Sequence, residues 1–161
     1  MTSFSLHARS EADTAKAATV LAEHLRAGDV VLLDGALGAG KTTFVQSVAR
    51  ALGATDAVTS PTFGIAHFYE TAHGRVIHVD TYRLESLAEF RDLGLDEYLP
   101  DAIGLIEWGA AVAEDFRHAL HVKIETVPGG SEDGRRLTLQ SDSSRWADSL
   151  AAMALDLGVQ A

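Results

Sequence analysis

Hydrophobic residues in the first third of the chain follow helical spacing, then strand spacing, then helical spacing again. Ser10 precedes apolar positions at helical spacing and has Asp13 three positions on, a weak capping-box pattern, while Gly28 marks the stop. Residues 30–33 form a β-branched and apolar run, as expected of a buried central strand. A glycine-rich stretch follows, and residues 41–52 return to helical spacing. This order predicts a helix, a buried strand, a tight loop and a second helix.

The rest of the chain alternates between strand and helix patterns. The predicted strands are 63–70 and 75–80, joined by a turn at His73 and Gly74, then 102–106, 120–124 and 137–139. The predicted helices are a short one capped by Ser86 with Glu89, and an amphipathic last helix over 146–157. The mixture predicts an α/β fold over residues 1–161, a single domain with a mixed parallel and antiparallel sheet flanked by helices.

Charge and composition narrow the function further. The chain of 161 residues has 13 Lys and Arg against 23 Asp and Glu, a formal charge of −10. Such an acidic surface repels a phosphate backbone, so strong direct binding to nucleic acid is not expected. The chain has no cysteine, no apolar signal core at its start and no apolar run of membrane-spanning length. These features predict a cytoplasmic protein without a membrane partner.

The glycine-rich stretch matches the P-loop pattern of Gly, four residues, Gly-Lys and Ser or Thr. A triphosphate is a dense anion, and consecutive backbone N–H groups at a helix N-terminus can surround it where side chains are small. Lys41 then brings a charge to the β- and γ-phosphates, and the hydroxyl of Thr42 ligates Mg²⁺. The predicted nucleotide-binding residues of this loop are Gly35, Ala36, Leu37, Gly38, Ala39, Gly40, Lys41, Thr42 and Thr43.

Two carboxylates that end apolar runs are candidates for the chemistry of the γ-phosphate. Asp80 and Glu107 each follow a predicted strand, and ligands collect at the carboxyl ends of strands in α/β sheets. The residues alone do not rank one above the other. Thr59, Ser60, Pro61 and Thr62 form a hydroxyl-rich loop where a nucleotide-sensing switch is expected. His78 lacks zinc-type spacing and is predicted to be structural, and Trp108 a packing residue at the rim of the site.

Five blocks in order carry a resemblance to a known family. They are Gly38-Ala39-Gly40-Lys41-Thr42-Thr43-Phe44, Thr59-Ser60-Pro61-Thr62-Phe63, His78-Val79-Asp80-Thr81-Tyr82-Arg83-Leu84, Gly94-Leu95-Asp96-Glu97-Tyr98 and Ile106-Glu107-Trp108. Together they resemble the TsaE (YjeE) family, the bacterial ATPases of tRNA threonylcarbamoyladenosine synthesis. The resemblance covers roughly residues 3–140.

The resemblance implies roles for individual residues. Thr42 and Glu107 are expected to hold Mg²⁺, with Lys41, Asp80 and Glu107 as the catalytic group. Thr59 to Thr62 are expected to act as the switch. Glu11 and Arg135 lie where the family places outer nucleotide contacts. Ala36 departs from the acid that family members often carry, at a position that the P-loop pattern leaves free.

The function that the resemblance implies is ATP hydrolysis in an accessory subunit, with Mg²⁺ as cofactor and ATP as substrate. Its partners are expected to be transferase subunits of the TsaB and TsaD type, which install threonylcarbamoyl on the adenosine next to the anticodon. Two alternatives stay open from the sequence: a P-loop small-molecule kinase, and a nucleotide-gated binding module without significant turnover.

Overall fold

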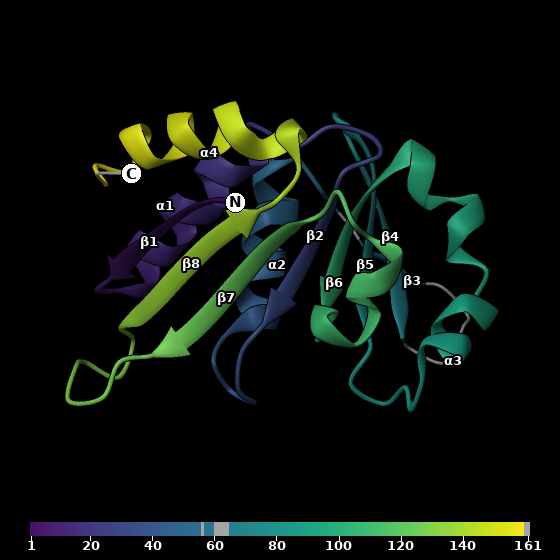
Figure 1. Cartoon of the computed structure of the whole chain (residues 1–161), viewed down its shortest axis with the longest axis horizontal. Helices are drawn as coiled ribbons and strands as arrows, with labels where there is room; N and C mark the ends of the chain where they lie inside the picture. Colours follow the sequence, from purple (N-terminus) through teal and green to yellow (C-terminus); the bar gives the residue numbers. More distant parts are fainter. Residues whose placement is uncertain (56, 60–64, 160–161) are drawn as a thin grey trace.

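The computed structural model describes residues 1–55, 57–59 and 65–159, which form a mixed β-sheet with helices on both faces (Figure 1). The strands of this described part are β1 (Thr2–Ala8), β2 (Val30–Asp34), β3 (Ala57–Thr59), β4 (Ala66–Thr71), β5 (Gly74–Asp80), β6 (Ala102–Glu107), β7 (Leu120–Thr126) and β8 (Arg135–Ser141). Their order is β1-β8-β7-β2-β6-β5-β4-β3. The central strands β7, β2, β6 and β5 run parallel, and the outer strands pair antiparallel. The predicted mixed α/β sheet is confirmed.

Helices and 3-10 turns cover the two faces with separate hydrophobic cores. The helical elements are α1 (Glu11–Ala22), α2 (Lys41–Ala51), α3 (Leu87–Asp92) and α4 (Ser144–Asp156), with 3-10 helices η1 (Leu95–Glu97), η2 (Leu99–Asp101) and η3 (Gly109–Asp115). One core joins α1, α2 and α4 to residues such as Leu33 and Leu105 of the sheet. The other joins α3 and the 3-10 helices to residues such as Leu32 and Ile106. Neighbouring residues of one strand therefore belong to different cores, as the pleat requires.

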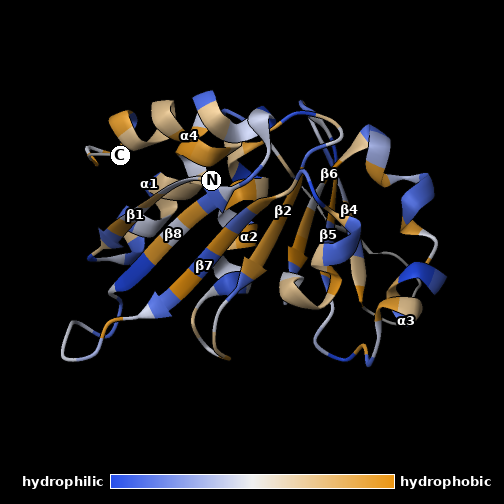
Figure 2. Ribbon diagram, in the orientation of Figure 1, coloured by the Kyte–Doolittle hydropathy of each residue, from blue (hydrophilic) through white to orange (hydrophobic). Residues whose placement is uncertain are grey.

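Hydrophobicity along the strands explains the sheet order. β2 is buried over its first four residues and β6 over all six, because helices cover both of their faces. β7 and β8 alternate between buried and more exposed positions, which marks strands with one covered face. Figure 2 shows the same contrast between the uniformly hydrophobic β2 and the alternating β8. The most apolar strands thus form the centre of the molecule.

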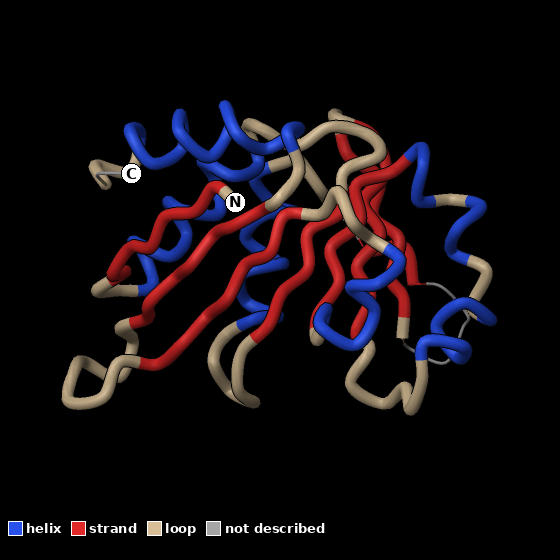
Figure 3. Tube along the Cα trace, viewed as in Figure 1, coloured by secondary structure: helices blue, strands red, loops and turns tan. Residues whose placement is uncertain are grey.

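The carboxyl ends of β2, β5 and β6 meet at one end of the sheet, and the loops that follow β2 and β5 emerge there together (Figure 3). In the sheet register, Leu33 of β2 and Asp80 of β5 both lie beside Glu107 of β6. The glycine-rich loop leaves β2 one residue further on, after Asp34. The fold therefore brings the predicted loop and both predicted carboxylates to one place.

Local hydrogen bonds fix two of the helix starts that the sequence predicts. The Ser10 hydroxyl accepts from the N–H of Asp13 at 3.2 Å, and the Asp13 carboxylate accepts from the N–H of Arg9 at 3.0 Å. At the start of α3, the Ser86 hydroxyl accepts from the N–H of Glu89 at 3.2 Å, and the Glu89 carboxylate accepts from the N–H of Glu85 at 3.0 Å. Both serines are N-caps that satisfy a backbone donor of the first turn, and both acids bind the N–H of the residue before the cap, a variant of the capping box.

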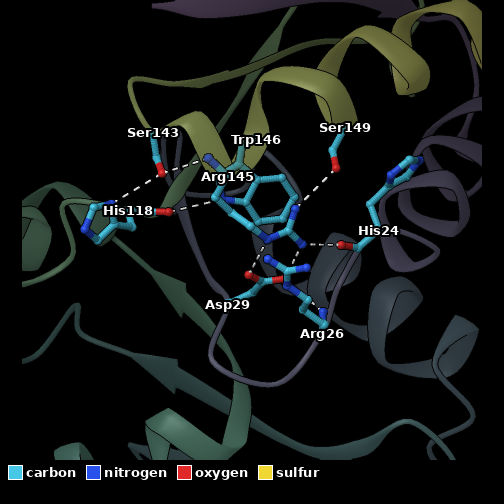
Figure 4. Close-up of polar contacts among 8 residues, drawn as sticks. All are labelled: His24, Arg26, Asp29, His118, Ser143, Arg145, Trp146 and Ser149. Atoms are coloured by element: carbon cyan, nitrogen blue, oxygen red, sulfur yellow. Dashed lines mark hydrogen bonds and ion pairs between the residues drawn. The ribbon is translucent and has the colours of Figure 1, made fainter.

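The last helix, α4, is tied to the loop before β2 by a buried ion pair (Figure 4). Arg145 donates to the two carboxylate oxygens of Asp29 at 3.0 and 2.7 Å and to the carbonyl of His24 at 2.6 Å. Its guanidinium lies over the Trp146 ring, 4.2 Å from the centroid, and the indole N–H donates to the His118 carbonyl at 3.1 Å. Each polar group of this cluster has a partner, so α4 is docked specifically as well as by its apolar stripe.

One feature differs from the sequence predictions. Ala57–Thr59 is a strand, β3, which pairs with β4, so Thr59 ends a strand and does not lie in a loop. Three residues and no apolar period are too little signal to predict it. The remaining predicted switch residues, Ser60, Pro61 and Thr62, lie outside the described residues.

Candidate nucleotide-binding site

The glycine-rich loop joins β2 to α2 in a conformation that its small residues permit. Gly40 is the N-cap of α2 with φ of 105°, in the left-handed region that favours glycine. A side chain at Gly35 would collide with the backbone carbonyl of Ile124 in β7. Ala39 is buried, and its carbonyl accepts from the Arg135 guanidinium at 2.7 Å. The loop therefore packs closely against β7 and Arg135 on one side, and the start of α2 borders a cavity on the other.

A cavity of about 310 Å³ lies in front of this loop. Its lining residues are Leu37, Gly38, Gly40, Lys41, Thr42, Thr43, Asp80, Tyr82, Glu107 and Trp108. The lining joins the first turn of a helix, whose backbone N–H groups lack partners within the helix, to a lysine and two carboxylates. Backbone donors and a cation on one side suit an anion, and carboxylates on the other side suit a metal ion.

Lys41 is the cation of this cavity, and only 4% of its surface is exposed. Its Nζ donates to the carbonyls of Gly35 and Ala36 at 2.7 and 3.0 Å and lies 4.0 Å from the centroid of the Trp108 ring. Burial lowers the pKa of Lys41 below its ordinary value, although the nearby carboxylates of Glu107 and Asp80 oppose that shift. The ammonium is held mainly by neutral groups, which leaves its charge available to an anion.

Glu107 ends β6 and is 3% exposed. Its Oε1 and Oε2 accept from the Thr42 hydroxyl at 2.8 and 3.0 Å, and Oε2 lies 2.5 Å from Nε2 of His78. Burial raises the pKa of Glu107, but the hydrogen bonds of His78 and Thr42 and the charges of His78 and Lys41 outweigh burial and lower it. An ionised carboxylate beside a hydroxyl oxygen is a donor set that fits Mg²⁺.

Asp80 ends β5 beside Glu107 in the sheet register and lines the same cavity. It is half-buried, and its Oδ1 accepts from the N–H of Tyr82 at 3.0 Å. One carboxylate oxygen thus stabilises the turn after β5, while the residue still borders the cavity. The structure therefore separates the two acids by environment: Glu107 is buried and bound to Thr42, and Asp80 is closer to solvent.

Trp108 turns the chain directly after Glu107. Among the described residues it alone, apart from glycines, has a positive φ, at 60°. This conformation costs on the order of 1–2 kcal/mol for a residue other than glycine. The bend is fixed by the Thr81 hydroxyl, which donates to the carbonyls of Glu107 and Trp108 at 2.9 and 3.1 Å. The strain places the indole ring over Lys41, with Tyr82 packed 5.1 Å away, centroid to centroid.

The outer residues predicted from the sequence lie beside the loop, around a smaller hollow. Glu11, Thr43 and Arg135 line it together with Ala39 and Gly40. Arg135 spends its donors on backbone carbonyls, that of Ala39 and, at 2.7 and 2.8 Å, those of Glu132 and Gly134. Arg135 thus supports the loop backbone. Its contact with a nucleotide stays a prediction, as does that of Glu11.

The sequence predicted a purely structural role for His78, but in the structure this residue belongs to the site. It lies two positions before Asp80 on β5, on the same face of the strand, and it contacts Glu107 directly. The spacing of His78 and Asp80 could have indicated that His78 faces the site, because residues two positions apart on a strand share one face. The contact with Glu107 could not be predicted, because Glu107 is 29 residues away in the sequence.

A larger cavity, of about 500 Å³, lies at the amino ends of β2 and β6. Apolar side chains such as Phe90, Leu95 and Leu99 line it, and its polar rim includes the paired Arg91 and Asp115. It lacks the convergence of helix N-terminus, lysine and carboxylates that distinguishes the loop cavity. Separately, no helix in the described part of the chain is long and apolar enough to cross a membrane.

The fold and the loop geometry define the class: a single α/β domain of the P-loop NTPase-like type, with its candidate site between a central parallel strand and the following helix. Comparison with known proteins agrees. The crystal structure of Bacillus subtilis YdiB superposes with a TM-score of 0.76 and 28% identity, covering 96% of both chains.

Sequence comparison then gives the family. The family model described as "Threonylcarbamoyl adenosine biosynthesis protein TsaE" matches residues 8–137. A protein of Streptomyces coelicolor named tRNA threonylcarbamoyladenosine biosynthesis protein TsaE is 42% identical over 79% of this chain and 89% of its own length. One of the same name from Bacillus subtilis is 37% identical over 83% of each chain. The chain belongs to the TsaE family, as the ordered sequence blocks predicted.

Proposed function

We propose that this protein is an ATPase that serves tRNA threonylcarbamoyladenosine synthesis. It binds ATP with Mg²⁺ in the cavity before the glycine-rich loop and hydrolyses ATP slowly alone. It acts as an accessory subunit of the assembly that installs threonylcarbamoyl on the adenosine next to the anticodon. The observation that carries the proposal is the convergence on one cavity of two buried side chains, Lys41 and Glu107, with the exposed Thr42, whose hydroxyl donates to Glu107.

Each residue has a task that its environment supports. The N–H groups at the start of α2 and the ammonium of Lys41 bind the β- and γ-phosphates. Thr42 and Glu107 would hold Mg²⁺, which when bound neutralises charge on the phosphate oxygens. Asp80, which lines the cavity and is closer to solvent, would stand near the metal or the attacking water. Burial of Lys41 and Glu107 strengthens these electrostatic interactions because the local dielectric is low.

ATP is proposed over GTP because guanine selection commonly uses an Asn-Lys-x-Asp stretch, and this chain contains no asparagine. A competition titration with both nucleotides tests this preference. We expect ATP to displace GTP well below equimolar concentration, and equal affinities would remove the claim.

The partners proposed are transferase subunits of the TsaB and TsaD type. A formal charge of −10 suits binding to proteins and leaves contact with tRNA to the partners. Two experiments test the function. Depletion of the protein should remove threonylcarbamoyladenosine from tRNA hydrolysates analysed by mass spectrometry. ATP turnover should rise when the purified partners are added, and an unchanged nucleoside profile would refute the pathway assignment.

A further inference from the structure

His78 and Glu107 form a buried contact between neighbouring parallel strands. Nε2 of His78 lies 2.5 Å from Oε2 of Glu107, and the two residues are 7% and 3% exposed. The Thr42 hydroxyl binds the same carboxylate. Glu107 is therefore hydrogen-bonded to α2 through Thr42 and to β5 through His78. Two anchors on separate elements define the orientation of a carboxylate far better than one.

The direction of the hydrogen bond follows from the chemistry of the carboxylate. An ionised carboxylate accepts hydrogen bonds and cannot donate. A glutamate carboxylate ordinarily has a pKa of about 4.3, so the group is ionised at neutral pH. The proton in the short contact therefore belongs to Nε2 of His78. Such a charge-assisted bond is about twice as strong as one between neutral groups.

A second histidine lies beside the His78 ring. His67 of β4 is opposite His78 in the antiparallel register, and the ring centroids are 6.0 Å apart. Val76, two positions before His78 on the same face of β5, and Leu105, opposite His78 in the parallel register, belong to the core on the face of α2. The imidazole thus has little room to rotate away from Glu107.

We propose that His78 is a positioning residue for the reaction: it fixes the Glu107 carboxylate in the orientation that the metal-bound nucleotide requires. This inference rests on the proposed function, because the role of Glu107 as a metal ligand is part of that proposal. His78 acts through Glu107 and does not touch the nucleotide. Its loss should therefore weaken the response to Mg²⁺ and leave the phosphate contacts of Lys41 and the loop intact.

The matched pair of variants is His78→Leu, which keeps a comparable volume without a donor, and His78→Gln, which keeps an N–H donor at similar reach. For His78→Leu we expect metal-free ATP affinity within about twofold of wild type. The Mg²⁺ concentration for half-maximal effect on ATP binding and on turnover should rise about 10–100-fold, the usual cost of losing a hydrogen bond to a metal ligand.

His78→Gln should recover most of this loss. His121→Leu, at a half-buried histidine of β7, is the control and should behave as wild type.

A measurement without metal or nucleotide tests the same geometry. In the free wild-type protein, nitrogen NMR of the imidazole should find a proton on Nε2 of His78. An unprotonated Nε2 overturns the proposal, and so does an equal Mg²⁺ response in His78→Leu and wild type, or equal losses in the Leu and Gln variants. If His78→Leu does not fold, His78→Asn replaces it, because its shorter amide cannot reach Glu107. Wild-type protein that binds no ATP would refute the proposed function itself, a result distinguishable from all of these.

Discussion

Two regions of this molecule bury charged side chains, and they do so differently. At the start of α4, Arg145 meets the carboxylate of Asp29 in a two-bond fork, with side chains 18% and 7% exposed. At the carboxyl end of the sheet, the ammonium of Lys41 meets two carbonyls and an aromatic ring, and the carboxylate of Glu107 meets a hydroxyl and an imidazole. Arg145 and Asp29 are paired directly in the first region, whereas no salt bridge joins Lys41 to a carboxylate among the described residues of the second.

This difference in how the charges are partnered distinguishes a structural ion pair from a candidate binding site. A buried ion pair whose members satisfy each other has no charge left for a ligand, and its removal chiefly harms folding. Buried charges that neutral groups hold beside a cavity retain most of their field for an incoming ion. The Trp108 backbone shows the second region carrying strain as well, which is common where geometry serves a ligand.

The largest expected effect is on stability, from Arg145→Ala. The change leaves the Asp29 carboxylate buried without its partner, and it should lower the free energy of unfolding by about 3 kcal/mol, the low end for such pairs because Arg145 is partly exposed. Urea denaturation measures this. Nucleotide affinity at a temperature where the variant is folded should stay within about twofold of wild type, and a larger change would mean that the two regions are coupled.

The next effect is on turnover, from Glu107→Ala. Lys41 and the loop N–H groups remain, so nucleotide affinity should stay within about tenfold, or 1.4 kcal/mol. Partner-stimulated ATP turnover should fall at least about a hundredfold, because the lost ligand stabilises charge that develops in the transition state. Calorimetry and a phosphate-release assay measure the two quantities. Normal turnover in the reconstituted assembly would make Glu107 structural and Asp80 the stronger candidate.

The smallest effect is expected from Arg91→Ala, which removes a fork of the same geometry on the surface. Arg91 donates to Asp115 at 3.0 and 2.7 Å, as Arg145 does to Asp29, but Arg91 is 57% exposed. Solvent screens such a pair, so we expect no measurable change in urea denaturation at neutral pH. Because both pairs have the same geometry, comparing Arg91→Ala with Arg145→Ala measures the effect of burial alone. Equal losses of unfolding free energy in the two variants would contradict this expectation.

The Arg91 pair also has a predictable pH dependence. The hydrogen bond and charge of Arg91 lower the pKa of Asp115 in the folded protein. Any stabilisation is therefore present above the ordinary pKa of aspartate and is lost as the pH falls through the lowered value. Thermal midpoints of wild type and Arg91→Ala should therefore stay together as the pH falls through that acid range, because the pair can only lose stabilisation there. A gap that widens in acid would contradict the lowered pKa.

Local patterns made most of the fold predictable. Ser10 with Asp13 and Ser86 with Glu89 predict helix starts, and in the structure each serine is the N-cap of its helix. The apolar runs that end in Asp80 and Glu107 predicted strands whose ends meet. Such signals work because they depend on residues a few positions apart.

The rest depends on contacts between distant residues. Arg145 and Asp29 are separated by 116 positions, and His78 and Glu107 by 29, with no periodicity to connect them. β3 is too short to have a pattern of its own and exists through its pairing with β4. The pairing of buried charges, which distinguishes the two regions, is therefore a property of the folded chain.

Calorimetric titration of ATP with Mg²⁺ tests whether the charge of Lys41 is available to a nucleotide. Wild type and Lys123→Ala, a change at a side chain 62% exposed, should bind with equal affinity. Lys41→Ala should lose about 1.5–3 kcal/mol of binding free energy, the range for a charge-assisted contact, while circular dichroism shows an unchanged fold. Equal binding by Lys41→Ala and wild type would contradict the claim.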